Sequence, residues 1–206
     1  LEKIMNKTLL ASALSLALAG NALADGHKVN IGIILGFTGP IESLTVDMGA
    51  GAELAISEVN SAGNFKFGEV SSVRGDSTCI DSAAATAAAE RLITADKVNA
   101  IVGGDCSGVT TAMLENVAVA NGTVMISPSA TSPALSTVAD NGLFFRTAPS
   151  DARQGEIVRD ILMEQGYKSI AISYTNNDYG KGLADSIEAN FKAAGGTVTL
   201  NASHED

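Results

Sequence analysis

The chain has 206 residues, and its 23 acidic side chains outnumber 13 lysines and arginines to give a formal net charge of −10. An acidic chain without basic clusters is poorly suited to bind nucleic acid or anionic lipid, because both are polyanions. Tryptophan is absent and aromatic residues make up 4% of the chain, so the core must rely on alanine, valine, isoleucine and leucine. That composition is typical of parallel sheets covered by helices.

The first feature along the chain is a short apolar segment with the layout of a cleavable export signal. Met5-Asn6-Lys7 gives a cationic start, residues 8–19 are apolar, and Ala22-Leu23-Ala24 supplies the small residues of a cleavage site. The apolar run is shorter than the about 20 residues that span a bilayer. A buried amphipathic helix is the alternative, but the segment lacks the polar stripe of such a helix. We therefore predict a signal peptide over residues 5–24 and a soluble periplasmic protein that begins at Asp25.

Strand and helix patterns alternate after this segment. Residues 29–35 form a continuous apolar run rich in β-branched residues, which is typical of a strand buried on both faces. Apolar residues then recur at helical spacing from Met48 to Ala62, where Gly63 ends the pattern. Repeated strand–helix units imply a mostly parallel sheet with helices on both faces. Further strands are predicted at residues 67–73, 100–102, 123–126 and 143–145, with helices after the N-cap residues Asp81 and Ser107.

A second unit begins near Ala148-Pro149. Asp151 and Gln154 have the spacing of a capping box at the start of a helix that ends at Gly166. A strand at 169–174, a helix closed by Gly195-Gly196 and the beginning of a strand at 197–200 follow. A sheet of two strands leaves its helices half covered. We therefore predict an α/β fold, with a doubly wound, mostly parallel first lobe over residues 25–147 and an incomplete second lobe over residues 148–206.

Two loops are candidate binding sites, because ligands of open parallel sheets bind beyond the carboxyl ends of the strands. The first is Gly-Gly-Asp-Cys-Ser-Gly at residues 103–108, where glycine allows close backbone approach. In this loop Ser107 offers a hydroxyl, and the helix start offers N–H groups and a partial positive charge. Together these groups suit an anion. The second loop, residues 127–133, is rich in hydroxyls and fixed by two prolines. Together they can hold a carboxylate and an ammonium; ordinary turn chemistry is the alternative.

Enzymatic motifs are missing from the sequence. The two histidines, His27 and His204, lie near the ends and not where a strand meets a helix, which argues against a Ser-His hydrolase. The sequence has no GxSxG, HExxH or GxxxxGK motif. In an oxidising compartment Cys79 and Cys106 favour a disulfide, with two buried free thiols as the alternative, and they leave no zinc set. We predict no catalytic residue, no metal and no cofactor.

Five segments, in their order along the chain, resemble the periplasmic solute-binding proteins of branched-chain amino acid ABC importers. They are residues 31–35 with Thr38-Gly39-Pro40, residues 104–107, residues 125–131, residues 145–151 and residues 177–182. The resemblance covers about residues 29–200. It implies a type I periplasmic binding protein, in which two α/β lobes joined by a hinge clamp a ligand in the cleft. The chain would supply lobe one to about Thr147 and only the start of lobe two.

The resemblance also implies roles for individual residues. Ser107 would bind the carboxylate of an amino acid through its hydroxyl and the helix N–H. Ser129, Ala130 and Thr131 would supply backbone and hydroxyl contacts to the carboxylate and the ammonium. Asp151 would lie at the hinge side of the cleft.

Further implied features concern the second lobe, the cysteines and the ligand side chain. Tyr179 would close over the ligand from lobe two. Cys79 and Cys106 match the family's disulfide, which would brace the loop that presents Ser107. Leu44 stands where some family members place an aromatic residue near the ligand side chain, which leaves the identity of the ligand open.

The function implied by the resemblance is that of an extracytoplasmic substrate-binding component of an ABC importer. It would be a monomer and not an enzyme, capture an amino acid, branched-chain or otherwise, or a related amide, and deliver it to an inner-membrane permease. Closure of the lobes would follow from ligand contacts with both of them. The alternatives are the ligand-sensing domain of a receptor or of an amide- or urea-responsive regulator and, third, an enzyme on the same sheet.

Overall fold

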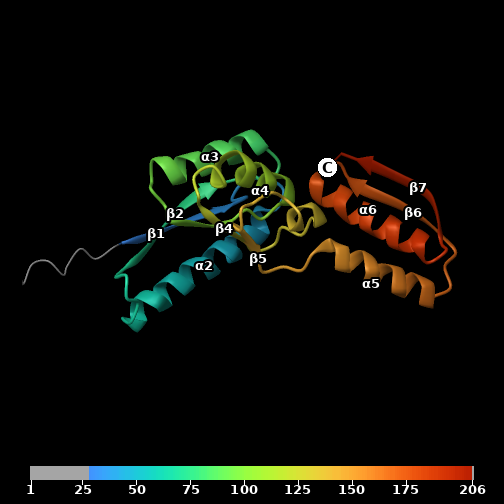
Figure 1. Ribbon diagram of the computed structural model, residues 1–206, viewed down its shortest axis with the longest axis horizontal. Coiled ribbons are helices and arrows are strands. Elements are labelled where there is room, and N and C mark those ends of the chain that lie inside the picture. Colours follow the sequence, from blue (N-terminus) through green and yellow to red (C-terminus); the bar gives the residue numbers. More distant parts are fainter. Residues whose placement is uncertain (1–27, 206) are drawn as a thin grey trace, which may run out of the picture.

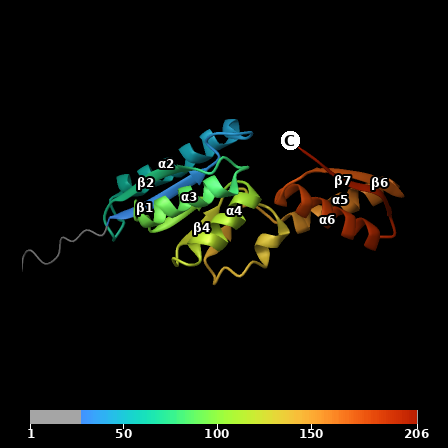
Figure 2. The same cartoon turned by 90° about the horizontal axis from the view of Figure 1, so that it is seen from above.

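The computed structural model describes residues 28–205, which form two α/β units side by side (Figure 1, Figure 2). The predicted signal peptide over residues 5–24 and the predicted mature start at Asp25 lie outside the described residues. Within residues 28–205, no helix combines the length and the apolar character needed to cross a membrane. The predicted boundary between lobes falls between the last strand of the first unit and the first helix of the second.

The first unit contains a five-stranded sheet in which all neighbouring strands are parallel. The strand order β2-β1-β3-β4-β5 reverses between β1 and β3, which makes that point the topological switch of the sheet. This confirms the predicted doubly wound parallel sheet. The strands are β1 (Val29–Leu35), β2 (Val70–Asp76), β3 (Ala100–Gly103), β4 (Val124–Ser127) and β5 (Phe144–Arg146).

The second strand begins later than predicted. Residues 67–69 were expected in it, but β2 starts at Val70. Phe67 instead packs edge to face against Phe65 with ring centroids 5.5 Å apart, beneath the nearby Lys66 ammonium. The apolar character of Phe67 therefore reflects this local aromatic contact and not a place in the sheet.

Helices cover the two faces of the first sheet unequally (Figure 1). α3 (Ser82–Thr94) and α4 (Ser107–Met113), which continues as the π-helical turn η1 (Leu114–Ala118), pack on one face over a buried apolar core. Of the helices in the described part of the chain, α2 (Glu42–Ala62) alone covers the other face. Strand alternation directs Ile126 and Phe145 to that side, where they remain 40% and 54% exposed.

The second unit contains α5 (Asp151–Glu164), β6 (Ser169–Thr175), α6 (Asp178–Ala193) and β7 (Thr197–His204). β6 and β7 form a two-stranded parallel sheet with one irregularity after Ile170. Phe191 is fully buried between α6 and this sheet, while Ile157 and Ile161 of α5 stay about half exposed. The predicted strands and helices of this unit are thus present, and its apolar faces are only partly covered by the described residues.

Two predicted helix caps have different outcomes. Asp81 caps α3 as predicted, because its Oδ1 accepts hydrogen bonds from the N–H groups of Ala83 and Ala84, both at 2.9 Å. The prediction that Ser107 is the N-cap of α4 is wrong: Cys106 has that place without a side-chain cap, and Ser107 is the first helical residue. The hydroxyl of Ser107 is used elsewhere, in a contact with the next loop.

Candidate ligand-binding site

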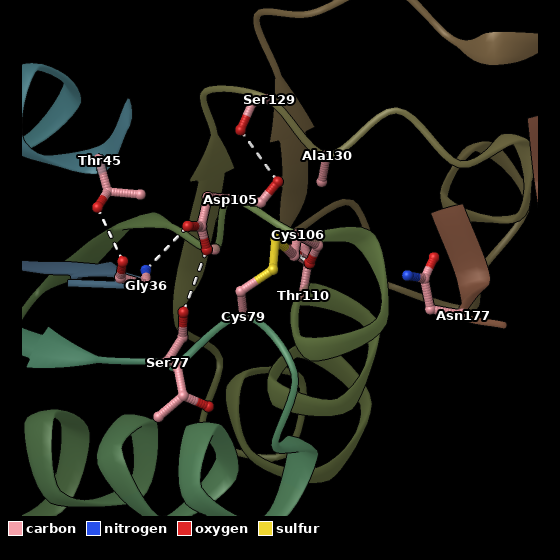
Figure 3. Close-up of a disulfide and its surroundings, with 12 residues drawn as sticks. Gly36, Thr45, Ser77, Cys79, Asp105, Cys106, Thr110, Ser129, Ala130 and Asn177 are labelled. Carbon is pink, nitrogen blue, oxygen red and sulfur yellow. Dashed lines mark hydrogen bonds between the residues drawn. A yellow bond between two sulfur atoms is a disulfide. The ribbon is translucent and has the colours of Figure 1, made fainter. Parts of the chain in front are cut away.

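A disulfide holds together the two loops that follow β2 and β3. Cys79 and Cys106 are joined with an S–S distance of 2.04 Å and a Cα–Cα distance of 5.3 Å (Figure 3). This confirms the predicted bond and rules out two free thiols. The bond ties the start of α4 to the end of β2, at the carboxyl edge of the sheet where the site was expected.

Ser107 connects the two predicted binding loops. Its side chain is nearly completely buried, and its Oγ accepts a hydrogen bond from the N–H of Ser132 at 3.1 Å. A hydroxyl has one proton and two lone pairs, so accepting this bond leaves the proton of Ser107 available for donation. The neighbouring loop therefore fixes the position of the Ser107 hydroxyl, whose role in binding an anion stays a prediction.

The loop that begins at Ser127 is folded around that residue's hydroxyl. Ser127 Oγ accepts hydrogen bonds from the N–H groups of Ser129 at 3.3 Å and Ala130 at 2.9 Å, and donates to the carbonyl of Gly104. Ser129 Oγ donates in turn to the carbonyl of Asp105 at 3.0 Å. The hydroxyl proton of Ser129 is thus engaged within lobe one, which leaves its lone pairs and backbone for a ligand.

Arg146 supports the same loop from β5 and was given no role in the sequence analysis. Its Nη1 donates to the carbonyl oxygens of Ser132 at 2.9 Å and Ala130 at 3.3 Å. Burial lowers the pKa of Arg146, against the opposing charge of Asp151. No local pattern indicates this role, since the arginine and its carbonyl partners are more than a dozen residues apart in sequence.

Asp151 is the least satisfied polar residue near the loops. It is 2% exposed, and its Oδ2 is buried without a hydrogen-bond partner among the described residues. Burial raises the pKa of Asp151, and a side-chain hydrogen bond with Thr131 and the charge of Arg146 only partly oppose this. Its backbone N–H also donates to the carbonyl of Thr131 at 2.9 Å.

The predicted capping box at Asp151 is wrong. Ser150 is the N-cap of α5 and accepts a hydrogen bond from the N–H of Ala152 at 3.2 Å, while Asp151 is the first helical residue. The side chain of Asp151 is therefore free of a capping role. It is buried near Thr131 and Arg146 at the start of lobe two.

Tyr179 lies on the second unit, near the start of α6. Asn177 caps this helix by accepting a hydrogen bond from the N–H of Gly180 at 2.9 Å, and the Tyr179 side chain is 46% exposed. α6 approaches lobe one closely, because a Cβ added at Gly182 would lie 3.0 Å from both Ser132 Oγ and Pro133 Cδ. The described contacts bring Ser107, Ser129, Ala130, Thr131 and Asp151 together within linked loops, and none of them includes the Tyr179 side chain.

Two other features do not belong to this group of residues. Leu44, in the first turn of α2, is 59% exposed. A shallow hollow of about 590 Å³ lies at the other end of α2, where Val59, Phe65 and Phe67 contribute to its lining. This hollow contains none of the predicted site residues and lies beyond the amino end of β2, so we do not assign it to the ligand.

The sequence family described as receptor family ligand binding region matches residues 47–206. The chain belongs to this family. Its fold is that of the type I periplasmic binding proteins, as the sequence predicted. A Leu/Ile/Val-binding protein of Citrobacter freundii is 32% identical over 195 residues, which are 94% of this chain and 52% of that protein.

Solved structures of substrate-binding proteins are also similar to this chain. The branched-chain amino acid transporter substrate-binding protein of Streptococcus pneumoniae, in complex with isoleucine, superposes with a TM-score of 0.75 at 29% identity, covering 86% of this chain and 50% of that one. An ABC transporter substrate-binding protein of Desulfitobacterium hafniense, in complex with leucine, gives a TM-score of 0.71 at 28% identity, covering 87% and 51%. The chain thus spans about half the length of the relatives it matches.

Proposed function

We propose that this chain is part of the extracytoplasmic substrate-binding component of an ABC importer, which captures an amino acid and delivers it to an inner-membrane permease. The observation that carries the proposal is the pairing of opposite binding groups. Within residues 28–205, the Ser107 hydroxyl accepts one hydrogen bond and can donate its proton to a carboxylate, while Asp151 has a buried oxygen without a hydrogen-bond partner, which suits an ammonium. A free α-amino acid carries both of these charged groups on one carbon.

In this arrangement the ligand carboxylate accepts hydrogen bonds from the Ser107 hydroxyl and the first N–H groups of α4. The ligand ammonium donates to Asp151 Oδ2, and the Thr131 hydroxyl and the carbonyl of Ala130 lie on loops linked to the same site. Ser129 contributes lone pairs and backbone only, because its hydroxyl proton is bound by Asp105. Each charged end of the ligand meets a partner that is already oriented by the protein, which lowers the entropic cost of binding.

Branched-chain amino acids are the first candidates for the ligand. The related Citrobacter freundii protein is named for leucine, isoleucine and valine, and the two solved structures hold isoleucine and leucine. Small amides and other amino acids remain in the test, because the described residues do not enclose the ligand side chain.

Delivery follows from a shift between open and closed lobes. A ligand that contacts both lobes favours closure by its additional affinity for the closed state. In this proposal Tyr179 closes over the ligand from α6, the permease recognises the closed form, and no bond of the ligand is broken. A periplasmic location, a monomer and the signal peptide over residues 5–24 belong to the same proposal.

A ligand-sensing domain is the second candidate, since the family description itself names receptors. The two functions share the site and differ in the partner. Deletion of the gene should abolish uptake of the radiolabelled ligand if the protein serves an importer, and should leave uptake intact while a ligand-dependent response is lost if it serves a receptor.

The binding test uses the full-length gene product that carries this sequence. We expect L-leucine, L-isoleucine or L-valine to raise its melting temperature, because a ligand at about a hundred times its Kd adds about 2.7 kcal/mol of stability. Ser107→Ala and Thr131→Ala should each weaken the Kd by about tenfold in calorimetric titration. Thr94→Ala removes an exposed hydroxyl that donates to the carbonyl of Glu90 on α3, and serves as the matched control.

Two results would contradict this proposal. A melting temperature that rises only with urea, an amide or another solute would keep the fold and reject the amino acid as ligand. Equal affinities for the wild type, Ser107→Ala and Thr131→Ala would reject the site.

A further inference from the structure

Asp105 is a buried carboxylate that the proposed ligand contacts do not use. Its side chain is 3% exposed, and it lies between β3 and the disulfide-bonded Cys106 (Figure 3). Oδ2 accepts a hydrogen bond from the N–H of Gly36 at 2.8 Å, and Oδ1 accepts one from the hydroxyl of Ser77 at 3.1 Å. Its backbone carbonyl accepts the bond from Ser129 Oγ at 3.0 Å.

These partners come from different strands. Gly36 follows β1, Ser77 follows β2, Asp105 itself follows β3 and Ser129 follows β4. One residue therefore links the carboxyl ends of four of the five parallel strands, including both strands that flank the topological switch point. We call this set of hydrogen bonds the strand-end brace.

Neighbouring contacts limit the freedom of the brace. The carbonyl of Gly36 accepts a hydrogen bond from the buried hydroxyl of Thr45 at 2.8 Å, which attaches the first turn of α2. A Cβ at Gly36 would lie 3.1 Å from Asp105 Oδ2 and 3.2 Å from Cys79 Cβ, so the loop after β1 sits directly against the carboxylate and the disulfide. Both Asp105 oxygens are thus occupied by the protein.

We propose that Asp105 is a positioning residue, which holds the Ser107 loop and the 127–131 loop in their binding geometry without contacting the ligand. The inference rests on the proposed function and assigns a new role within the same site. Because Asp105 precedes Ser107 by two residues and fixes Ser129 through its carbonyl, movement of Asp105 displaces both ends of the site. Loosening such a supporting contact weakens binding although every ligand-contacting group is still present.

The test compares an isosteric and a truncating substitution in the full-length gene product. Asp105→Asn keeps an acceptor for the Gly36 N–H and can donate its amide to the Ser77 hydroxyl, so we expect the Kd for L-leucine to stay within about threefold. Asp105→Ala removes both side-chain bonds, and we expect a Kd weaker by about tenfold or more, with faster dissociation.

Asp140→Ala is the matched control. The Asp140 carboxylate also accepts two backbone hydrogen bonds, from Gly142 at 3.0 Å and Phe144 at 3.1 Å, but at the amino end of β5. This variant should lower the melting temperature and leave the Kd unchanged. A purely structural role for Asp105 predicts the same behaviour for Asp105→Ala, and that result would overturn the proposal.

Hydrogen exchange of the ligand-free protein separates the brace from the choice of ligand. In Asp105→Ala the amides of Gly36, Ala130 and Ser132 should exchange faster than in the wild type, whereas Asp105→Asn should retain their protection. If the wild type does not bind L-leucine, the proposed ligand is wrong, and the hydrogen-exchange rates alone test whether Asp105 holds the two loops. Unchanged protection in Asp105→Ala would overturn it.

Two further outcomes are decisive. If Asp105→Asn weakens binding as much as Asp105→Ala while the Gly36 amide stays protected, the carboxylate acts through its charge, and the positioning role is wrong. If Asp105→Ala does not fold, Ser77→Ala removes one arm of the brace only. An intermediate loss of affinity in Ser77→Ala supports the proposal, and a wild-type Kd contradicts it.

Discussion

At the scale of single residues, Asp151 places a carboxyl group in an unfavourable buried position beside the loops of the proposed site. Within residues 28–205 its buried Oδ2 has no hydrogen-bond partner, and burial raises the pKa of the carboxyl above its usual range. Since the unfolded chain releases this proton at lower pH, ionised Asp151 opposes folding as pH rises through the interval between the two pKa values. In the proposed function a ligand ammonium would remove that cost, and part of the binding energy would come from pairing this carboxylate.

The raised pKa of Asp151 predicts a pH dependence of affinity. An ammonium binds the ionised carboxylate, so the Kd for L-leucine should weaken as pH falls through the pKa of Asp151, beginning at higher pH than for an ordinary aspartate. Asp151→Asn should bind about tenfold more weakly at pH 7 and show a flatter profile. Titration calorimetry between pH 7 and pH 4 measures both. Parallel profiles for the two proteins would show that Asp151 does not meet the ammonium.

At the scale of elements, the disulfide fastens the loop after β2 to the start of α4. Thr78 and Cys79 in this loop both have positive φ angles, 57° and 69°, a region that residues other than glycine rarely adopt. The carboxylate of Asp76 supports this loop. It accepts hydrogen bonds from the N–H of Thr78 at 2.9 Å and from the hydroxyl of Thr38 at 2.6 Å. The short covalent and polar contacts give α4 a defined starting point despite the missing side-chain cap.

Loss of the disulfide should reduce stability. The bond joins residues 27 apart in sequence, and closing a loop of that length in the unfolded chain is worth about 3–4 kcal/mol. We expect reduction, or the double substitution Cys79→Ala with Cys106→Ala, to lower the free energy of unfolding by about that amount in urea titrations. Addition of reductant to the double variant is the control and should have no effect. An unchanged midpoint on reduction of the wild type would contradict the expectation.

The elements also show what the sequence could and could not predict. Apolar runs and helical spacing located every strand and helix of the described residues 28–205 that forms the two sheets and their covering, because these patterns follow from which faces are buried. The predicted N-caps of α4 and α5 were wrong, because Ser107 accepts a hydrogen bond from the distant Ser132 and the side chain of Asp151 is buried among residues of lobe one. The roles of Arg146 and Asp105 were missed because their partners lie on other strands, and hydrogen bonds across a fold leave no local pattern.

At the scale of the whole molecule, both units leave apolar side chains exposed among the described residues. Beside α2, Ile126 and Phe145 are substantially exposed, and Ile157 and Ile161 on α5 are too. Contiguous exposed apolar surface promotes association. Residues 28–205 thus combine a well-packed core under α3 and α4 with surfaces that expose large apolar side chains.

A protein made of residues 25–206 alone should therefore bind a hydrophobic dye and self-associate. The double substitution Ile126→Thr with Phe145→Thr keeps β-compatible side chains on the α2 face and should reduce both effects. Sedimentation and dye fluorescence measure both effects, and Ser71→Thr on β2 is a single-site strand control that leaves Ile126 and Phe145 in place. Monomeric behaviour of the unsubstituted protein at high concentration would show that these faces do not drive association.

The contact at Gly182 has a consequence for how affinity can evolve. A Cβ at this position would lie 3.0 Å from Ser132 Oγ and Pro133 Cδ, so a side chain here requires lobe one and α6 to move apart by a few tenths of an ångström. We expect such a change to disfavour the approach of the lobes without replacing any of the proposed ligand-contacting residues, so that it acts first on the population of the closed form. A single substitution outside the proposed ligand contacts would then set the solute concentration at which half of the protein is closed. Proteins from nutrient-rich and nutrient-poor habitats could differ in that concentration and still recognise the same solute.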